Sequence, residues 1–104
     1  MTFSERVVQL ALMIPLGRVT TYGRIAIAAG GGAMASQSVT NILGKAYIEG
    51  QKDIPFHRVV YANGRVWMDD SHREKRLQLY KKEHIKLNDR GVIEDFQDKL
   101  FEFV

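Results

Sequence analysis

Apolar and polar positions in residues 3–14 recur with the period of an α-helix. Thr2 followed three residues later by Glu5 is a capping-box pattern, which predicts a helix that begins here. Pro15 and Gly17 predict its end. The apolar positions that share one face of this helix are Phe3, Val7, Leu10, Ala11 and Ile14.

Two further helices are predicted by the next thirty residues. Thr21 is the expected N-cap of a short, Ala-rich helix over residues 22–29, and three glycines at 30–32 interrupt the pattern. A third helix is expected from about residue 35 to residue 46. Its apolar positions are Val39, Ile42, Leu43 and Ala46, which recur at the spacing of one helical face.

The third helix carries a polar and nearly uncharged outer face. Two helices joined by a short glycine turn are typical of a helix-turn-helix, in which the second helix approaches nucleic acid. An ordinary helical hairpin on a small core fits the same pattern equally well. The polar positions of the outer face are Gln37, Ser38, Asn41 and Lys45.

A β-hairpin is predicted after the helices. Residues 58–61 and 65–67 are rich in β-branched and aromatic side chains, and Asn63-Gly64 between them is a strong hairpin signal. A hairpin that follows a helix-turn-helix would be the wing of a winged helix. Trp67 is expected to pack in this wing; the alternative is that it lines a binding pocket.

The last third of the chain predicts two more helices. One is expected from about His72 to Lys82, after a turn with N-cap candidates at residues 69–71, and a short strand near Ile85 and Leu87 follows. The other is expected over residues 94–103, with Phe96, Leu100 and Phe103 facing inward. The fold class is therefore mostly α with a small β-hairpin wing, a winged helix-turn-helix domain spanning residues 1–104.

Composition excludes several chemistries. The chain has no cysteine, so it has no disulfide, thiolate metal site or thiol nucleophile. No apolar run is long enough to span a bilayer, and the start has no signal-peptide pattern, so we expect a cytoplasmic protein. The net charge is +3, and residues 73–90 hold seven Lys and Arg against three acids. Such a local excess is typical of a nucleic-acid-binding surface, or of a solvated helix face.

Three segments together resemble the DNA-binding, active-site domain of the O6-alkylguanine-DNA alkyltransferases. Residues 17–26, G-R-V-T-T-Y-G-R-I-A, are similar to the family's G-x-V-x-(S/T)-Y-G-x-I-A. The third predicted helix is similar to the family's recognition helix in its apolar pattern. Residues 54–60, I-P-F-H-R-V-V, differ at one position from the family's active-site motif I-P-C-H-R-V-V. The resemblance runs from about residue 3 to residue 87.

The one difference removes the transfer chemistry. Phe56 stands where the family has the cysteine that accepts the alkyl group, and a phenyl ring has no lone pair to attack an alkyl carbon. The chain therefore resembles the alkyltransferase-like proteins, which lack that cysteine. The resemblance implies a non-enzymatic protein that binds O6-alkylguanine in duplex DNA and flags it for nucleotide excision repair. The alternative is a winged-helix DNA-binding module without lesion specificity, acting as a regulator or architectural protein.

The resemblance also implies a set of site residues. Tyr22 corresponds to the tyrosine that rotates the nucleotide out of the stack, and Gln37 stands where the family has an arginine finger. His57 and Glu83 are expected to form a buried hydrogen-bonded pair. The lesion pocket is expected to comprise Tyr22, Phe56, His57, Val59 and Glu83, and the DNA-binding residues Tyr22, Arg24, Gln37, Ser38, Asn41, Lys45 and Arg58.

Some of these assignments have alternatives. Arg58 could instead be internal, bonded to loop carbonyls that brace the recognition helix. The family's pocket wall is a Tyr-Ser-Gly-Gly-Leu type of loop, whereas the matching stretch here is D-D-S-H-R, with Asp69 and Asp70 beside a site meant for DNA. We expect neither a metal site nor a cofactor, and we expect a monomer.

Overall fold

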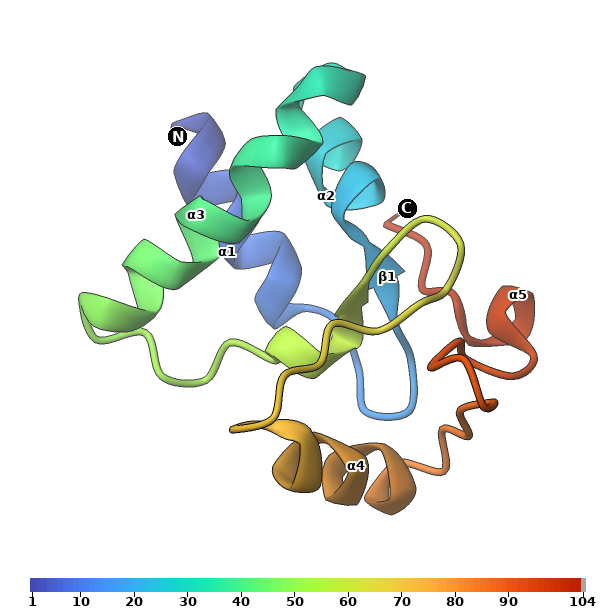
Figure 1. Cartoon of the computed structure of the whole chain (residues 1–104). Helices are drawn as coiled ribbons and strands as arrows, with labels where there is room; N and C mark the ends of the chain where they lie inside the picture. Colours follow the sequence, from blue (N-terminus) through green and yellow to red (C-terminus); the bar gives the residue numbers. More distant parts are fainter. Residues whose placement is uncertain (104) are drawn as a thin grey trace.

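The computed structural model of the protein describes residues 1–103. Helices α1, α2 and α3 gather on one side of a very short sheet, and α4 lies on the other side (Figure 1). The elements follow in the order α1 (Phe3–Leu12), β1 (Thr20–Thr21), α2 (Tyr22–Ala28), the 3₁₀ turn η1 (Ala33–Ala35), α3 (Ser36–Ile48), the 3₁₀ turn η2 (Phe56–Arg58), β2 (Val59–Val60), α4 (Arg73–Lys82) and α5 (Phe96–Lys99).

The start of α1 is fixed by the predicted capping box. The backbone N–H of Glu5 donates to Thr2 Oγ1 at 3.1 Å, and the backbone N–H of Thr2 donates to Glu5 Oε1 at 3.1 Å. These two bonds satisfy donors that have no partner within the helix. The inward face of α1 places Val7 and Ala11 fully inside the core, as the apolar spacing predicted.

The helix pair α2 and α3 forms as predicted. Thr21 caps α2, because its hydroxyl accepts a hydrogen bond of 3.1 Å from the backbone N–H of Arg24. Gly30, with a φ of +94°, then turns the chain toward α3 in a conformation that side chains with a Cβ rarely adopt. Helix α3 packs against both α1 and α2, and Val39 and Leu43 are buried at this junction.

The sheet departs in detail from the predicted hairpin. Asn63-Gly64 does form a tight turn, since the N–H of Gly64 donates to the carbonyl of Tyr61 at 2.8 Å. However, β2 pairs in parallel with β1, in the register Thr20 to Val59, and not with residues 65–67. Arg65 forms an antiparallel bridge to Val92 instead. The N–H of Tyr61 donates to the carbonyl of Arg65 at 3.0 Å across the turn, but residues 65–67 are not part of the two-stranded sheet.

The predicted helix over residues 94–103 is wrong in its extent. Helix α5 covers Phe96–Lys99 alone, and the chain then becomes extended so that Leu100 pairs in parallel with Val19. The N–H of Phe101 donates to the carbonyl of Val19 at 2.8 Å, and the N–H of Val19 donates to the carbonyl of Lys99 at 3.0 Å. A helix through this segment would lose both bonds. The inward placement of Phe96, Leu100 and Phe103 is confirmed, since all three pack on the core.

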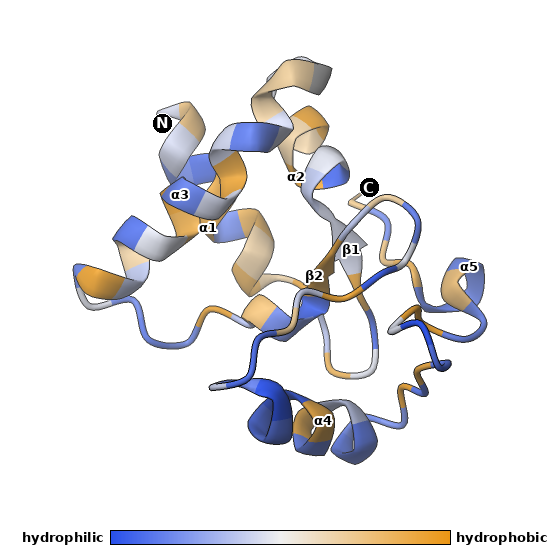
Figure 2. Cartoon of the chain, viewed as in Figure 1, coloured by the Kyte–Doolittle hydropathy of each residue, from blue (hydrophilic) through white to orange (hydrophobic). Residues whose placement is uncertain are grey.

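The interior divides into two apolar clusters on the two sides of the sheet. The larger lies among α1, α2 and α3, and the smaller contains Val19, Val60, Tyr80 and Ile93. Helix α4 is largely hydrophilic (Figure 2) and buries Tyr80, whose hydroxyl donates to the carbonyl of His57 at 2.6 Å. Tyr80 thus attaches the polar helix α4 to the segment around η2.

Along residues 1–103, no helix combines the length and the apolar character that crossing a bilayer requires. Within the same range, no group of three His, Asp or Glu side chains is arranged to hold a metal ion.

Candidate functional site

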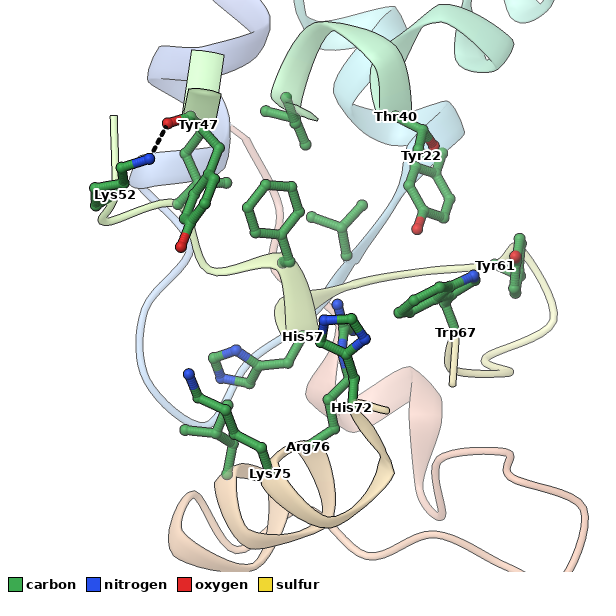
Figure 3. A pocket seen from close by; sticks show the side chains of 15 residues that line it. Tyr22, Thr40, Tyr47, Lys52, His57, Tyr61, Trp67, His72, Lys75 and Arg76 are labelled. Atoms are coloured by element: carbon green, nitrogen blue, oxygen red, sulfur yellow. Dashed lines mark hydrogen bonds between the residues drawn. The ribbon is translucent and has the colours of Figure 1, made fainter. Parts of the chain in front are cut away.

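A cavity of about 590 Å³ opens between α3, the η2–β2 segment and α4 (Figure 3). We call it the aromatic pocket, because aromatic side chains from separate parts of the chain form much of its wall. Residue 56 comes from the 3₁₀ turn η2, and residue 22 from the N-terminus of α2. Its aromatic lining residues, apart from histidines, are Tyr22, Tyr47, Phe56, Tyr61 and Trp67.

Below the pocket lies a buried network centred on Glu83, which we call the floor. Glu83 Oε2 lies 2.5 Å from His57 Nε2, and both side chains are buried. Arg58 donates from Nε to Glu83 Oε1 and from Nη2 to Oε2, each at 3.0 Å. The N–H of Gly17 also donates to Oε1 at 3.0 Å. The predicted His57–Glu83 pair is therefore confirmed, and it belongs to a larger network.

The network controls the charge of its members. Burial raises the pKa of Glu83, but the hydrogen bonds from Arg58, Gly17 and His57 outweigh it and lower the pKa to about 2. The pKa of His57 is lowered chiefly by burial, against the attraction of Glu83. In the neutral ring, the contact with Glu83 assigns the proton to Nε2 and leaves Nδ1 as an acceptor. The carboxylate is therefore ionised and the imidazole neutral at physiological pH.

Phe56 occupies the position between the rigid Pro55 and the floor. Its ring packs edge-on against Tyr47, with centroids 5.7 Å apart, and it lines the aromatic pocket. The side chain offers contact area and no atom able to form a bond to an alkyl carbon. The arrangement around His57 and Glu83 therefore has no thiol to activate, since the chain has no cysteine.

The structure brings together most of the predicted pocket residues. Tyr22, Phe56, His57 and Val59 line the aromatic pocket. Glu83 does not line it: it lies behind His57, with an exposed fraction of 4%, and acts through the ring that it holds. The resemblance predicted the right partner for His57 and its burial, but it wrongly included Glu83 among the residues that line the pocket.

The polar positions of α3 form one exposed face, as expected. Gln37, Ser38, Asn41 and Lys45 all lie on the outward side of the helix. Lys45 lies 3.9 Å from Glu49 one turn later, and its side chain remains 80% exposed. On α2, Arg24 lies 3.3 Å from Glu102 in an exposed ion pair. Both cations can leave such pairs at little cost, because exposed pairs contribute little free energy.

Arg58 has the internal position that the sequence left as an alternative. Besides its two bonds to Glu83, its Nη1 donates to the carbonyl of Ile14 at 3.0 Å, after α1. The guanidinium thus joins the end of the first helical segment to the floor. Its donors already have partners within the fold, whereas the side chain of Lys45 remains exposed to solvent.

Sequence reasoning did not assign to the pocket Tyr47 on α3, nor the residues of the wall opposite α3. Trp67 lines the aromatic pocket, which corrects the expectation that it packs in a wing. Asp69 is not among the residues that line the pocket: its Oδ1 lies 2.7 Å from His72 Nδ1 and accepts from the backbone N–H of His72 at 2.8 Å. Arg76 lies with its guanidinium carbon 4.9 Å from the centroid of Trp67. The sequence signal that could have indicated this wall is a tryptophan followed by a helix rich in Lys and Arg.

Comparison with solved structures identifies the same fold. S. pombe Atl1, in a crystal structure with damaged DNA containing O6-carboxymethylguanine, superposes with a TM-score of 0.74 at 20% identity, covering 97% of this chain and 95% of that chain. A structure of S. pombe ATL in complex with DNA gives a TM-score of 0.74 at 22% identity, with the same coverage. These similarities confirm the mostly helical, winged helix-turn-helix class.

Comparison of sequences identifies the family. The chain is 34% identical over 93 residues to the DNA base-flipping protein of Escherichia coli K12, which covers 89% of this chain and 70% of that protein. The base-flipping protein of Shigella flexneri gives the same values. Residues 2–85 match the family described as 6-O-methylguanine DNA methyltransferase, DNA binding domain. Because this match covers most of the sequence and agrees with the fold, the chain belongs to that family of DNA-binding domains.

Proposed function

We propose that this protein binds duplex DNA and holds an O6-alkylated guanine, rotated out of the base stack, in the aromatic pocket without reacting with it. The observation that carries the proposal is a cavity of about 590 Å³ with aromatic walls, beside Tyr22 and the polar helix α3. This volume lies in the range of sites that enclose a small organic group. Aromatic faces stack on any extruded base, at about 1–3 kcal/mol per base.

The proposed docking uses the exposed face of α3. Gln37 and Asn41 lie about one turn apart on this face, and their amides can contact bases and sugars without a charge. Tyr22 lies at the N-terminus of α2, where its ring is 5.5 Å from that of Tyr61. A ring at this edge can press on the nucleotide and stabilise its rotated state. Gln37 would fill the gap that the rotated base leaves.

The absence of reaction follows from Phe56 and the lack of any cysteine. With no group to accept the alkyl substituent, a bound lesion stays in the DNA and must be processed by other proteins. We therefore propose that the complex, formed by a monomer, flags the lesion for nucleotide excision repair. The names and complexes of the relatives support DNA and lesion binding.

A titration of matched duplexes tests this proposal. One duplex carries guanine and the other O6-methylguanine at the same place, with 2-aminopurine beside it and the salt concentration fixed, because phosphate contacts dominate both affinities. We expect tighter binding to the modified duplex and brighter 2-aminopurine fluorescence on unstacking. Prolonged incubation should leave the lesion intact and the protein mass unchanged.

Two results would contradict the proposal. A methyl adduct on the protein would show that it is an enzyme. Equal affinities with no fluorescence change would instead support a winged-helix DNA-binding module without lesion specificity. That second candidate is favoured by Gln37, which is neutral where an inserted cation would hold an extruded base more firmly.

A further inference from the structure

The aromatic pocket has a one-sided charge. Among its lining residues none is Asp or Glu, whereas Lys52, Lys75 and Arg76 are cations. Figure 3 shows Lys75 and Arg76 extending from α4 toward His57 and His72, with Lys52 across the pocket beside Tyr47. A neutral alkyl group needs none of these charges. The lining therefore contains more recognition chemistry than the binding of a methylated base requires.

Arg76 is the best placed of the three cations. It is partly buried, and its guanidinium is held over the ring of Trp67. Within residues 1–103 it forms no ion pair with a carboxylate. Its charge reaches the floor: burial is the main cause of the lowered pKa of His57, and the charges of Arg58 and Arg76 act in the same direction. The guanidinium thus lines the pocket beside Trp67, close enough for its charge to act on His57.

The neighbouring groups leave Arg76 available. Asp69, an acidic residue before α4, is engaged by the side chain and backbone of His72. Lys52 is held on the opposite side, where its Nζ donates to the carbonyl of Tyr47 at 2.7 Å and lies 4.0 Å from the ring centroid. A group that enters the aromatic pocket therefore meets Lys52 on one side and the cations of α4 on the other. No Asp or Glu is among the residues that line the pocket.

We propose that the aromatic pocket selects O6-adducts of guanine that end in an anionic group, and that Arg76, assisted by Lys75, determines this selectivity. The inference rests on the proposed function and specifies the class of adduct. A carboxylate on the adduct can accept two parallel hydrogen bonds from a guanidinium, a geometry that a neutral amide cannot reproduce with equal strength. Stacking on Trp67 orients the guanidinium in advance, which reduces the entropy lost on binding.

A DNA phosphate is the other possible source of the anion. A phosphate contact by Arg76 would strengthen binding to all duplexes, because every duplex carries the same backbone. Contact with the adduct would strengthen binding only where the adduct is charged. The two sources are therefore separated by comparing adducts of one shape and different charge.

The experiment measures affinities for three otherwise identical duplexes at pH 7 and fixed salt. They carry O6-methylguanine, O6-carboxymethylguanine and O6-carbamoylmethylguanine; the last two have nearly the same shape and differ in charge. We expect the carboxymethyl duplex to bind about tenfold more tightly than the carbamoylmethyl duplex, as for a hydrogen bond that gains a charge. Arg76→Gln should reduce this ratio to near one, and Arg76→Lys should restore part of it.

Arg73→Gln is the matched control. Arg73 lies on the same helix, is exposed and does not line the pocket, so its replacement should change the affinities for both charged and neutral adducts by the same factor. Circular dichroism confirms that each variant is folded.

Each arm has a result that overturns the inference. A ratio near one in the native protein shows that adduct charge is not recognised. If Arg76→Gln weakens every duplex, including unmodified DNA, by one factor, the cation binds phosphate. Either result can occur while O6-methylguanine still binds better than guanine, so the inference can fail alone. Loss of that preference in the native protein would reject the proposed function itself.

Discussion

The floor and the mouth of the aromatic pocket are both charged, but the charges have different surroundings. In the floor, the carboxylate of Glu83 meets His57, Arg58 and the N–H of Gly17, and all are held inside the fold. At the mouth, Lys75 and Arg76 form no ion pair with a carboxylate within the described chain. The paired, buried charges of the floor therefore hold the shape of the site. The cations at its edge have no carboxylate partner and are available to a ligand.

The largest expected effect is the loss of the floor's central carboxylate. Glu83→Ala leaves the Arg58 guanidinium without its main partner inside the protein, so we expect the free energy of unfolding to fall by about 3–5 kcal/mol. Urea denaturation followed by circular dichroism measures this. Glu94→Ala, at an exposed position, is the control, with an expected change within about 0.5 kcal/mol. A similar small change for Glu83→Ala would show that the floor does not stabilise the fold.

Lowering the pH should reduce the stability of the folded protein by less than Glu83→Ala does. The pKa of Glu83 is lowered to about 2 in the folded protein, against an ordinary value of 4.5, so its contribution is complete above pH 4.5 and is lost as the pH falls toward 2. His57, with a lowered pKa, loses stability in the same direction below its ordinary value of 6.5, because the unfolded chain binds the proton first. Thermal unfolding between pH 7 and pH 3 measures the sum. Stability that is constant over this range in the native protein would contradict the assignment.

At the rim, Tyr22→Ala should affect recognition more than stability. We expect a loss of about tenfold in the preference for O6-methylguanine over guanine, because rotating a nucleotide out costs a few kcal/mol that the ring helps to offset. Fluorescence of 2-aminopurine beside the lesion should be dimmer than with the native protein. Tyr61→Ala is a useful comparison, since Tyr61 contacts Tyr22 but lies on another segment. An unchanged preference in Tyr22→Ala would remove it from the flipping step.

The smallest effect is expected on the exposed face of α3. Lys45→Gln should weaken modified and unmodified duplexes alike by a few-fold and reduce the slope of log affinity against log salt by about one. Arg58→Gln should instead lower the free energy of unfolding and leave that slope unchanged, because its guanidinium is used internally. Affinities measured from 50 to 200 mM salt (about the range in which phosphate contacts are resolved) test both. A changed slope for Arg58→Gln would assign it to DNA after all.

The sequence predicted the parts of the structure that local interactions determine. The capping box at Thr2, the cap at Thr21 and the apolar face of α3 depend on residues a few positions apart, and all three appear in the structure. The pair of His57 and Glu83 was also predicted, but only because the surrounding motif resembled a known family. The place of Arg58 was left open between a DNA contact and an internal position bonded to loop carbonyls, and its bonds to Glu83 were not predicted.

The errors fall where distant segments compete with local pattern. Apolar spacing favours a helix through Leu100, yet the pairing of Leu100 with Val19, far away in sequence, makes this segment extended. Likewise, β2 pairs with β1, whereas the hairpin pattern predicted that it would pair with residues 65–67. Trp67 was misplaced for the same reason, because its partner Arg76 comes from a helix that periodicity alone could not orient.

The parallel pairing of β1 with β2 has a consequence for the order in which the protein folds. Thr20 must meet Val59, and Val19 must meet Leu100, so these ladders close long loops and cost more chain entropy than the local turns of α1–α3. The helical segment can form while the chain is still being synthesised, but Phe56 and Trp67 take their places beside Tyr22 only when the later segments arrive. An incomplete chain would therefore present α3 without a finished pocket, and binding of a modified base would report the completed fold.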